Sequence, residues 1–322
     1  MTVTQANAID AANGTGVTTG TIVNTTRVTA LATLTSTGGV SAYTITIPTD
    51  DATSTAANLA LIDAATSVAV GAANVTTVTG TATQVVAFAT AEQAGTITAA
   101  TNYAATITGS TTGANANTVD AANGDGTITI LGTENGETLD LSGATGPLVI
   151  SGLAGNDVIT GGGGADNITG GTGADNLTGG AGVDTYVMLS ADLGDTITDF
   201  AVAEDRIDYN TTLVAINSAG AVVYQAGAAD TTLAVATTVF ELTGVTTAGS
   251  AANLVTALGT TATNADIDAA DSILFVNYLA AGGAQVWRFL DANGANVEDT
   301  ELTLLVTLTG VAADAVITGN FI

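Results

Sequence analysis

The chain has 322 residues and a formal net charge of −27, from 30 acidic residues against three arginines, with no lysine, histidine or cysteine. Such a charge repels nucleic-acid phosphates and anionic membranes, because binding to either requires a basic surface. The missing histidines exclude HExxH zinc sites and Ser–His–Asp triads, and the missing cysteines exclude disulfides and thiol chemistry.

The first 120 residues alternate short strands with short helices. Apolar and polar residues alternate where strands are expected, and Ala/Leu-rich stretches mark the helices. The expected elements are a strand at 42–48, a helix at 54–65, strands at 67–70 and 75–78, a helix at 83–93 and a strand at 96–98. This order predicts a small α/β or solenoid-like domain over residues 1–120.

Three further short strands, separated by Gly/Asn turns, are expected at 126–131, 137–141 and 147–151. We interpret them as degenerate coils of the more regular structure that follows. Asp125, Glu134 and Glu137 lie in their turns. These residues either bind metal or are solvated surface charges, and we favour the second alternative.

From Gly152 to Val187 the chain repeats every nine residues, as GLAGNDVIT, GGGGADNIT, GGTGADNLT and GGAGVDTYV. Each unit has glycines at its first, usually second, and fourth positions, Asp at the sixth and an apolar residue at the eighth. Only glycine adopts positive φ without steric cost, so the first six residues predict a tight turn and the last three a short strand. The alternative is a flexible Gly/Asp-rich linker, but a linker does not keep its apolar residues in one phase, as here at Ile159, Ile168, Leu177 and Tyr186.

One unit cannot bury its single apolar side chain alone, so the units must stack, with strands about 4.8 Å apart. Two units form one coil, which places Asp157 over Asp175 and Asp166 over Asp184. Carboxylates held this close repel each other unless a cation lies between them. Ca²⁺ suits the pattern because it takes six to eight oxygen ligands and accepts backbone carbonyls. We therefore expect a stack that folds only with calcium.

This pattern resembles the RTX, or haemolysin-type, calcium-binding repeat GGxGxDxUx, whose fold is a parallel β-roll. The resemblance implies three calcium sites. The first takes Asp157 with the carbonyls of Leu153 and Gly155, and Asp175 with those of Gly170 and Thr172. The second takes Asp166 with the carbonyls of Gly162 and Gly164, and Asp184 with those of Gly179 and Ala181. The third takes Asp175 with the carbonyls of Gly171 and Gly173, closed by less regular residues after Met188.

Residues 194–200 and 204–208, GDTITDF and EDRID, resemble the segment that ends such rolls, and the resemblance adds Asp195 and Asp199 to the metal ligands. Beyond them, the expected elements are a helix at 250–259 and strands at 272–278, 284–290 and 301–308. The loop after the second of these strands carries Asp291, Asn293 and Asp299, where we favour an Asx turn over a further calcium site.

The strand order in the last hundred residues resembles the ending of type I secreted RTX proteins. The first residues show no Sec-type signal pattern. The resemblance therefore implies type I secretion from a Gram-negative bacterium and an extracellular or cell-surface location. The fold class is expected to be mainly β: a parallel β-roll at 121–208 between the N-terminal domain at 1–120 and a β-rich secretion domain at 209–322.

We do not expect an enzyme, because no GxSxG elbow or phosphate-binding loop is present and a single tryptophan offers a poor platform for sugars. No apolar run is long enough to span a bilayer. The expected function is a secreted calcium-binding structural protein that self-assembles outside the cell, as an S-layer or filament subunit. The alternative is a calcium-dependent adhesin or biofilm matrix protein that binds a cell-surface polysaccharide. Adhesins are usually far longer, which favours the first.

Overall fold

The computed structural model describes residues 1–13, 17–22, 28–35, 41–189, 193–209, 224–227, 239–247, 272–279, 282–290, 302–312 and 315–316. The chain divides into two compact units, and each is described here by itself. Unit 1 comprises Met1–Leu131 and Gly143–Val149, and unit 2 comprises Gly132–Ser142 and Ile150–Ile322.

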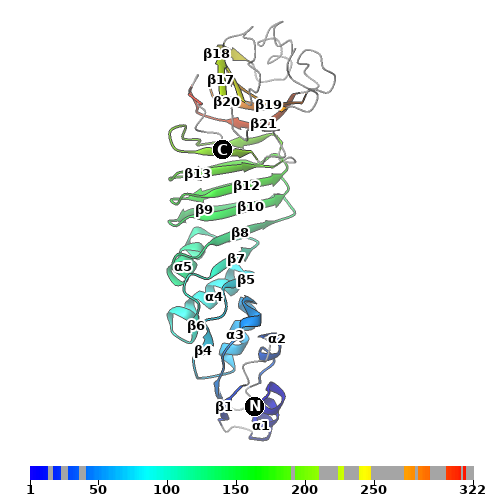
Figure 1. Cartoon of the computed structure of the whole chain (residues 1–322), viewed down its shortest axis with the longest axis vertical. Coiled ribbons are helices and arrows are strands. Elements are labelled where there is room, and N and C mark those ends of the chain that lie inside the picture. Colours follow the sequence, from blue (N-terminus) through cyan, green and yellow to red (C-terminus); the bar gives the residue numbers. More distant parts are fainter. Residues whose placement is uncertain are drawn as a thin grey trace. The chain divides into compact units, whose positions relative to one another are not determined.

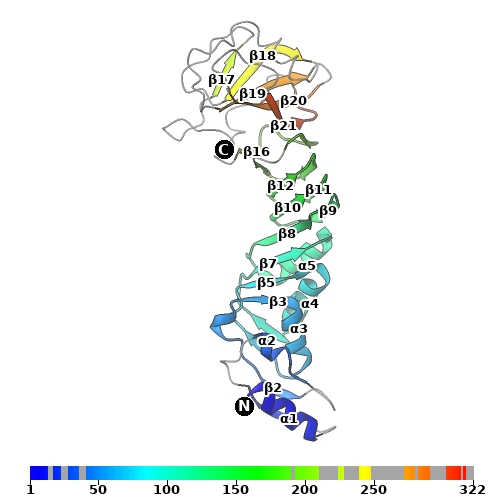
Figure 2. The same ribbon diagram turned by 90° about the vertical axis from the view of Figure 1, so that its right-hand side faces the viewer.

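Unit 1 is a parallel solenoid of strands and helices. Its main sheet has the strands β3, β5, β7 and β8 in parallel order, with Ser54, Val78, Ala105 and Ile128 in register. Helices α3, α4 and α5 lie along one side of these strands (Figure 2). The helices are α1 (Val3–Asn13), α2 (Val28–Leu31), α3 (Ala56–Ala64), α4 (Ala82–Gln93) and α5 (Gly113–Asn123), with a 3₁₀ turn at Thr49–Asp51. The strands are β1 (Thr19–Thr21), β2 (Ala42–Thr44), β3 (Thr53–Thr55), β4 (Val70–Ala72), β5 (Thr77–Thr81), β6 (Ile97–Ala99), β7 (Ala104–Thr108) and β8 (Ile128–Thr133).

Threonines cap the first turns of helices α3, α4 and α5. The Thr55 and Thr112 side chains accept hydrogen bonds from backbone N–H groups in the first turns of α3 and α5, and Thr81 forms a capping box with Gln84 at α4. The predicted helices at 54–65 and 83–93 are confirmed as α3 and α4. Helices α1 and α5 were not predicted, because asparagine, aspartate and threonine, which have weak helix propensity, interrupt the alanines of both sequences.

Unit 2 begins with a parallel roll of two sheets, whose strands follow one another as rungs (Figure 1). One sheet pairs β10, β12, β14 and β16 in order, and the other continues from β9 through β11, β13 and β15. The strands are β9 (Thr138–Ala144), β10 (Leu148–Ala154), β11 (Val158–Gly162), β12 (Asn167–Thr172), β13 (Asn176–Gly180), β14 (Thr185–Met188), β15 (Asp195–Ile197) and β16 (Arg206–Tyr209).

The roll has the eighteen-residue coil that the repeats predict. Ile159 pairs with Leu177, and Ile168 with Tyr186. These four side chains, at the eighth position of their units, are fully buried between the two sheets. Val158, one residue earlier in its strand, points outward and is 45 % exposed. Side chains alternate between inward and outward along each short strand, and the inward ones therefore form the core of the roll.

Strand β21 (Leu302–Leu308) pairs in parallel with β15 and so extends the sheet of β9, β11 and β13. Strands β20 (Ala284–Leu290) and β19 (Ser272–Leu279) follow in antiparallel pairing, and β18 (Val239–Thr247) and β17 (Tyr224–Gly227) complete the sheet. The three strands predicted in this region are confirmed as β19, β20 and β21. The predicted helix at 250–259 lies outside the described residues. Within the described part, no helix is long and apolar enough to cross a membrane.

Candidate calcium sites

The aspartates of the repeats form two columns, one at each edge of the roll. In column A, the backbone N–H of Asp157 donates to Asp175 Oδ1 at 2.7 Å, and that of Asp175 donates to Asp195 Oδ1 at 2.9 Å. In column B, the N–H of Asp166 donates to Asp184 Oδ1 at 2.9 Å. The Oδ1 atoms of Asp175, Asp184 and Asp195 are thus fixed by the coil before them, and the stacking of Asp157 over Asp175 and of Asp166 over Asp184 is confirmed.

The second carboxylate oxygen points into the turn. Asp157 and Asp184 are each 1 % exposed, and Asp175 is 2 % exposed. The Oδ2 atom of each of these three is buried without a hydrogen-bond partner. Burying a carboxylate oxygen without a partner is costly, so these positions call for a cation.

A cradle for the cation lies beside the first glycine of each unit. A Cβ atom built on Gly161 would be 2.5 Å from Asp166 Oδ2 and 2.5 Å from the carbonyl oxygen of Gly179 in the next coil. Gly152 has the same surroundings, with Asp157 Oδ2 and the Gly170 carbonyl. Glycine leaves these positions free of side chains. A carboxylate oxygen and a backbone carbonyl oxygen face each of them, and Ca²⁺ accepts both as ligands. The residues therefore fit calcium.

The other predicted carbonyl ligands lie in the same turns, from coil to coil. The carbonyls of Leu153 and Gly155 lie against the α-carbons of Gly171 and Gly173, and those of Gly162 and Gly164 lie against Gly180 and Gly182. Two predicted residues also join the coils by hydrogen bonds: the Thr172 carbonyl accepts from the Gly155 N–H, and the Ala181 N–H donates to the Gly162 carbonyl, both at 2.8 Å.

The electrostatics of the columns favour a bound cation. Burial raises the pKa of Asp157, Asp175 and Asp184 above the usual range of aspartate. The neighbouring Asp175 and Glu137 carboxylates raise the pKa of Asp157 further. Among the described residues no three acidic side chains lie close enough to hold a metal by themselves. A site here therefore combines one or two carboxylates with backbone carbonyls, as the repeat predicts.

Two residues in the columns were not among the predicted ligands. Glu137 stands one coil before Asp157: its backbone N–H donates to Asp157 Oδ1 at 2.8 Å, and its Oε1 accepts from Thr133 N–H. We favoured a surface charge for it, but the structure places it half-buried in column A. Asp205 continues column B, because its Oδ1 accepts from Asp184 N–H at 3.0 Å. Coil lengths of 20 and 21 residues at these ends hide both from a search for nine-residue steps.

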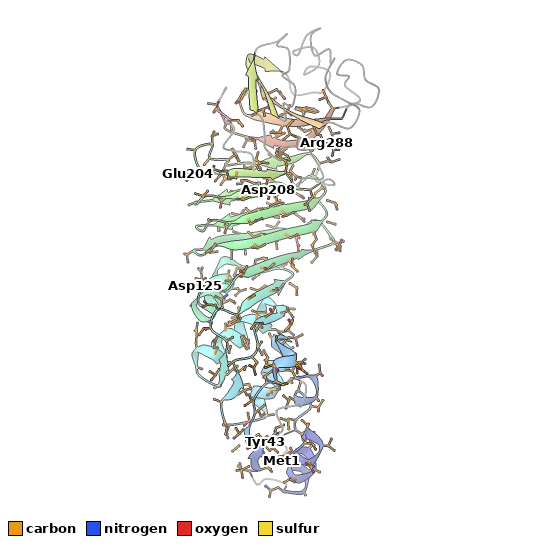
Figure 3. All side chains as sticks on the ribbon, in the orientation of Figure 1. Met1, Tyr43, Asp125, Glu204, Asp208 and Arg288 are labelled. Atoms are coloured by element: carbon orange, nitrogen blue, oxygen red, sulfur yellow. The ribbon has the colours of Figure 1, made fainter. Side chains whose placement is uncertain are left out.

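Asp199 lies beside column B rather than in it. Its carboxylate accepts from the N–H groups of Gly179 and Gly180 and from the Tyr186 hydroxyl. Of the other acidic residues considered, Asp125 and Glu134 are exposed, and Asp125 lies in the turn between α5 and β8 of unit 1, where it is labelled in Figure 3. Asp291, Asn293 and Asp299 lie outside the described residues.

A family model described as the RTX calcium-binding nonapeptide repeat matches residues 149–186 with four copies. The chain carries an array of RTX repeats. RTX nonapeptide repeats bind calcium, so calcium is the cation that the two columns of this roll take. Such repeats are generally structural and indicate an extracellular protein.

Among solved structures, the chain is similar to the solution structure of the AlgE6R3 subunit from the Azotobacter vinelandii mannuronan C5-epimerase. The identity is 24 %, the match covers 59 % of this chain and 80 % of that one, and the TM-score is 0.32. No curated protein matches the chain.

Proposed function

We propose that this chain is a secreted structural protein whose roll folds on meeting calcium outside the cell and whose copies then assemble into a sheet or filament. Two physical steps support the proposal. The first is folding on calcium, and the second is the effect of the bound ions on the charge of the roll.

The folding step is supported by the buried oxygens of the columns. Without a cation, the closed turns of Asp157, Asp175 and Asp184 each hold a buried carboxylate oxygen, Oδ2, that has no hydrogen-bond partner. The open, hydrated chain avoids this cost, so calcium binding and folding of the roll share one free energy. Cytosolic calcium is too scarce to fill such sites, whereas extracellular modules work at millimolar concentrations.

The assembly step is carried by one observation. The only charged residues between Val149 and Met188 are the four aspartates of the columns, and all four are buried. The outward positions of the strands carry small uncharged side chains, with Asn167 beside Thr185 and Thr160 beside Thr178 in register. Once calcium neutralises the columns, the two faces of this segment carry no charge, and charge repulsion no longer keeps copies of it apart.

A calcium titration tests the folding step. In excess EGTA we expect the β-sheet circular dichroism of the roll to be absent, and we expect it to appear with a midpoint on the order of 10⁻⁴ to 10⁻³ M calcium. A roll that is fully formed in chelator contradicts this step.

Electron microscopy of the purified chain tests the assembly step. Sheets or fibres that form in millimolar calcium and dissolve in EGTA support it. Monomers that stay dispersed at the same calcium concentration refute it. If these monomers also bind a polysaccharide from the cell surface, the protein is an adhesin instead.

A further inference from the structure

Threonines cover the outward face of the main sheet in unit 1, on the side away from the helices (Figure 2). Side chains alternate along the strands, and Ser54, Val78, Ala105 and Ile128 are buried toward the core. Their neighbours in each strand point outward, and eight of these ten outward residues are threonines. They form the threonine face, which consists of Thr53, Thr55, Thr77, Thr79, Thr81, Ala104, Thr106, Thr108, Thr129 and Leu131.

The pairing of the strands arranges these threonines as a grid. The strands pair one to one from β3 through β5 and β7 to β8. Neighbouring strands lie about 4.8 Å apart, and successive outward residues along one strand lie about 6.6 Å apart. The face therefore repeats in two perpendicular directions. The columns that cross the strands are Thr55, Thr79, Thr106 and Thr129 in the middle, Thr53 and Thr77 on one side, and Thr81 and Thr108 on the other.

The hydroxyl groups in the middle of the face are available to a partner. Within the part of unit 1 that the structure describes, the side chains of Thr77, Thr79, Thr106 and Thr129 make no hydrogen bond to the protein. A threonine hydroxyl donates one hydrogen bond and accepts two, and the branched Cβ restricts the side chain to few rotamers. The face thus holds donors and acceptors at fixed, regularly spaced places.

The residue types of the face exclude most other partners. The face has no charged residue and no aromatic ring, whereas the adjoining helices α3, α4 and α5 carry Asp63, Glu92 and Asp120. A strand surface that serves only solubility carries mixed charges. A soluble sugar or other small ligand is bound in a concave site with aromatic side chains and a few directed polar groups. A regular grid of hydroxyls fits a partner that is itself a regular lattice.

We propose that the threonine face binds ice. The spacings of its grid, across and along the strands, are close to those at which water molecules repeat on a prism face of hexagonal ice. Hydrogen bonds to liquid water require water to be immobilised, which costs entropy. Water in ice is already immobilised, so hydroxyls that match the lattice form hydrogen bonds without this cost. Ice binding goes beyond the proposed function, because it needs neither the calcium columns nor the assembly of copies.

Partitioning of the full chain into ice, in a calcium buffer, tests the proposal. Ice is grown slowly from a dilute solution, and the chain is then measured in the ice and in the remaining liquid. Growing ice pushes ahead of it a solute that does not bind. We therefore expect the chain to be more concentrated in the ice than in the liquid. A chain that is more concentrated in the liquid overturns the proposal.

Two variants of α4 and β7 locate the binding. Thr106→Tyr places a ring on the middle column and keeps the strand, because tyrosine has a high β propensity. It should lose more than half of the retention in ice, with an unchanged circular dichroism spectrum. Thr83→Tyr is the matched control, because Thr83 is exposed on α4, and its retention should be unchanged. Equal retention by both variants overturns the proposal.

The double variant Thr79→Val/Thr106→Val separates the hydroxyls from the shape of the face. Valine has nearly the shape of threonine and suits a strand, so the fold should be kept while two central hydroxyls are removed. We expect lower retention in ice, and unchanged retention overturns the proposal. If the unaltered chain is excluded from ice and Thr106→Tyr instead prevents assembly in calcium, the face joins copies of the chain and ice binding is refuted. Failure of assembly alone, with retention in ice, refutes only the proposed function.

Discussion

Replacing Gly161 by alanine places a methyl group in the cradle of column B. Gly161 does not have a positive φ, so alanine is compatible with its backbone, and the effect of the change is steric. The new Cβ would lie 2.5 Å from the carbonyl oxygen of Gly179, which belongs to the next coil. An unstrained C···O contact is about 3.3 Å or longer, so the two coils must separate by about 0.8 Å or the turn must deform.

The loss in the free energy of unfolding has two parts. Overpacking of this kind destabilises by about 1–3 kcal/mol, of which about 0.4–1 kcal/mol is offset because alanine restricts the unfolded chain. Loss of one calcium site costs about 1.4 kcal/mol when free calcium is ten times the dissociation constant. We therefore expect Gly161→Ala to lower the free energy of unfolding of the roll by about 1.4–4 kcal/mol in calcium.

Urea unfolding followed by circular dichroism, together with calcium counting by calorimetry, measures both parts. Gly143→Ala is the control, because a Cβ on Gly143 would approach the Ala114 amide nitrogen only to 4.0 Å, an ordinary contact distance. It should be neutral or stabilise slightly. The cradle is refuted if Gly161→Ala binds as many calcium ions as the unaltered chain and unfolds within about 0.5 kcal/mol of it.

Three further predictions follow from the columns and the core. Asp175→Ala should lose two calcium ions and Asp157→Ala one, because Asp175 stands between two aspartates of column A; equal losses by calorimetry would contradict this register. Ile168→Ala should destabilise the calcium-loaded roll by about 2–5 kcal/mol in urea, because the side chain is fully buried, whereas Val158→Ala, on the outer face, should cost much less; similar costs would place the core elsewhere. In EGTA, acidification from pH 7 to pH 4 should increase the β-sheet signal, since the column aspartates have raised pKa values in the folded roll. Protonation of these aspartates stabilises the roll, fully so below the ordinary aspartate pKa, near 4. This stabilisation is lost as the pH rises through the raised pKa values of the folded roll. A β-sheet signal that falls on acidification would contradict the prediction that protonation stabilises the roll.

The sequence predicted the structure best in the repeats, where the same type of residue recurs at a fixed position and has the same role in every coil. The nine-residue step predicted the two columns and the four buried core positions, because a one-residue error would turn Ile168 or Leu177 outward. Helices α3 and α4 were predicted from their Ala- and Leu-rich stretches. The outer strands β19, β20 and β21 were predicted from their alternating pattern.

The ends of the columns were harder to predict, for a physical reason. Glu137 and Asp205 are joined to their columns through backbone N–H groups, and such bonds tolerate a coil of 20 or 21 residues as well as one of 18. Their spacing therefore carries no periodic signal. Asp199 was placed among the ligands by resemblance to the ends of other rolls, but its three donors and its link to Tyr186 depend on where β15 stops.

The two kinds of coil respond differently to insertions and deletions during evolution. In unit 1 the step from β3 to β5 is 24 residues, from Thr53 to Thr77, and the next, from Thr77 to Ala104, is 27. Because helices and loops outside the sheet absorb the difference, a lineage can add or lose a few residues there without changing the strand register. A coil of the repeats has no helix or long loop that could absorb an insertion. A single extra residue inside it moves an aspartate off its column and turns a core side chain to the outside. Change in that segment is therefore expected in steps of eighteen, as the gain or loss of whole coils, and each step adds or removes calcium capacity.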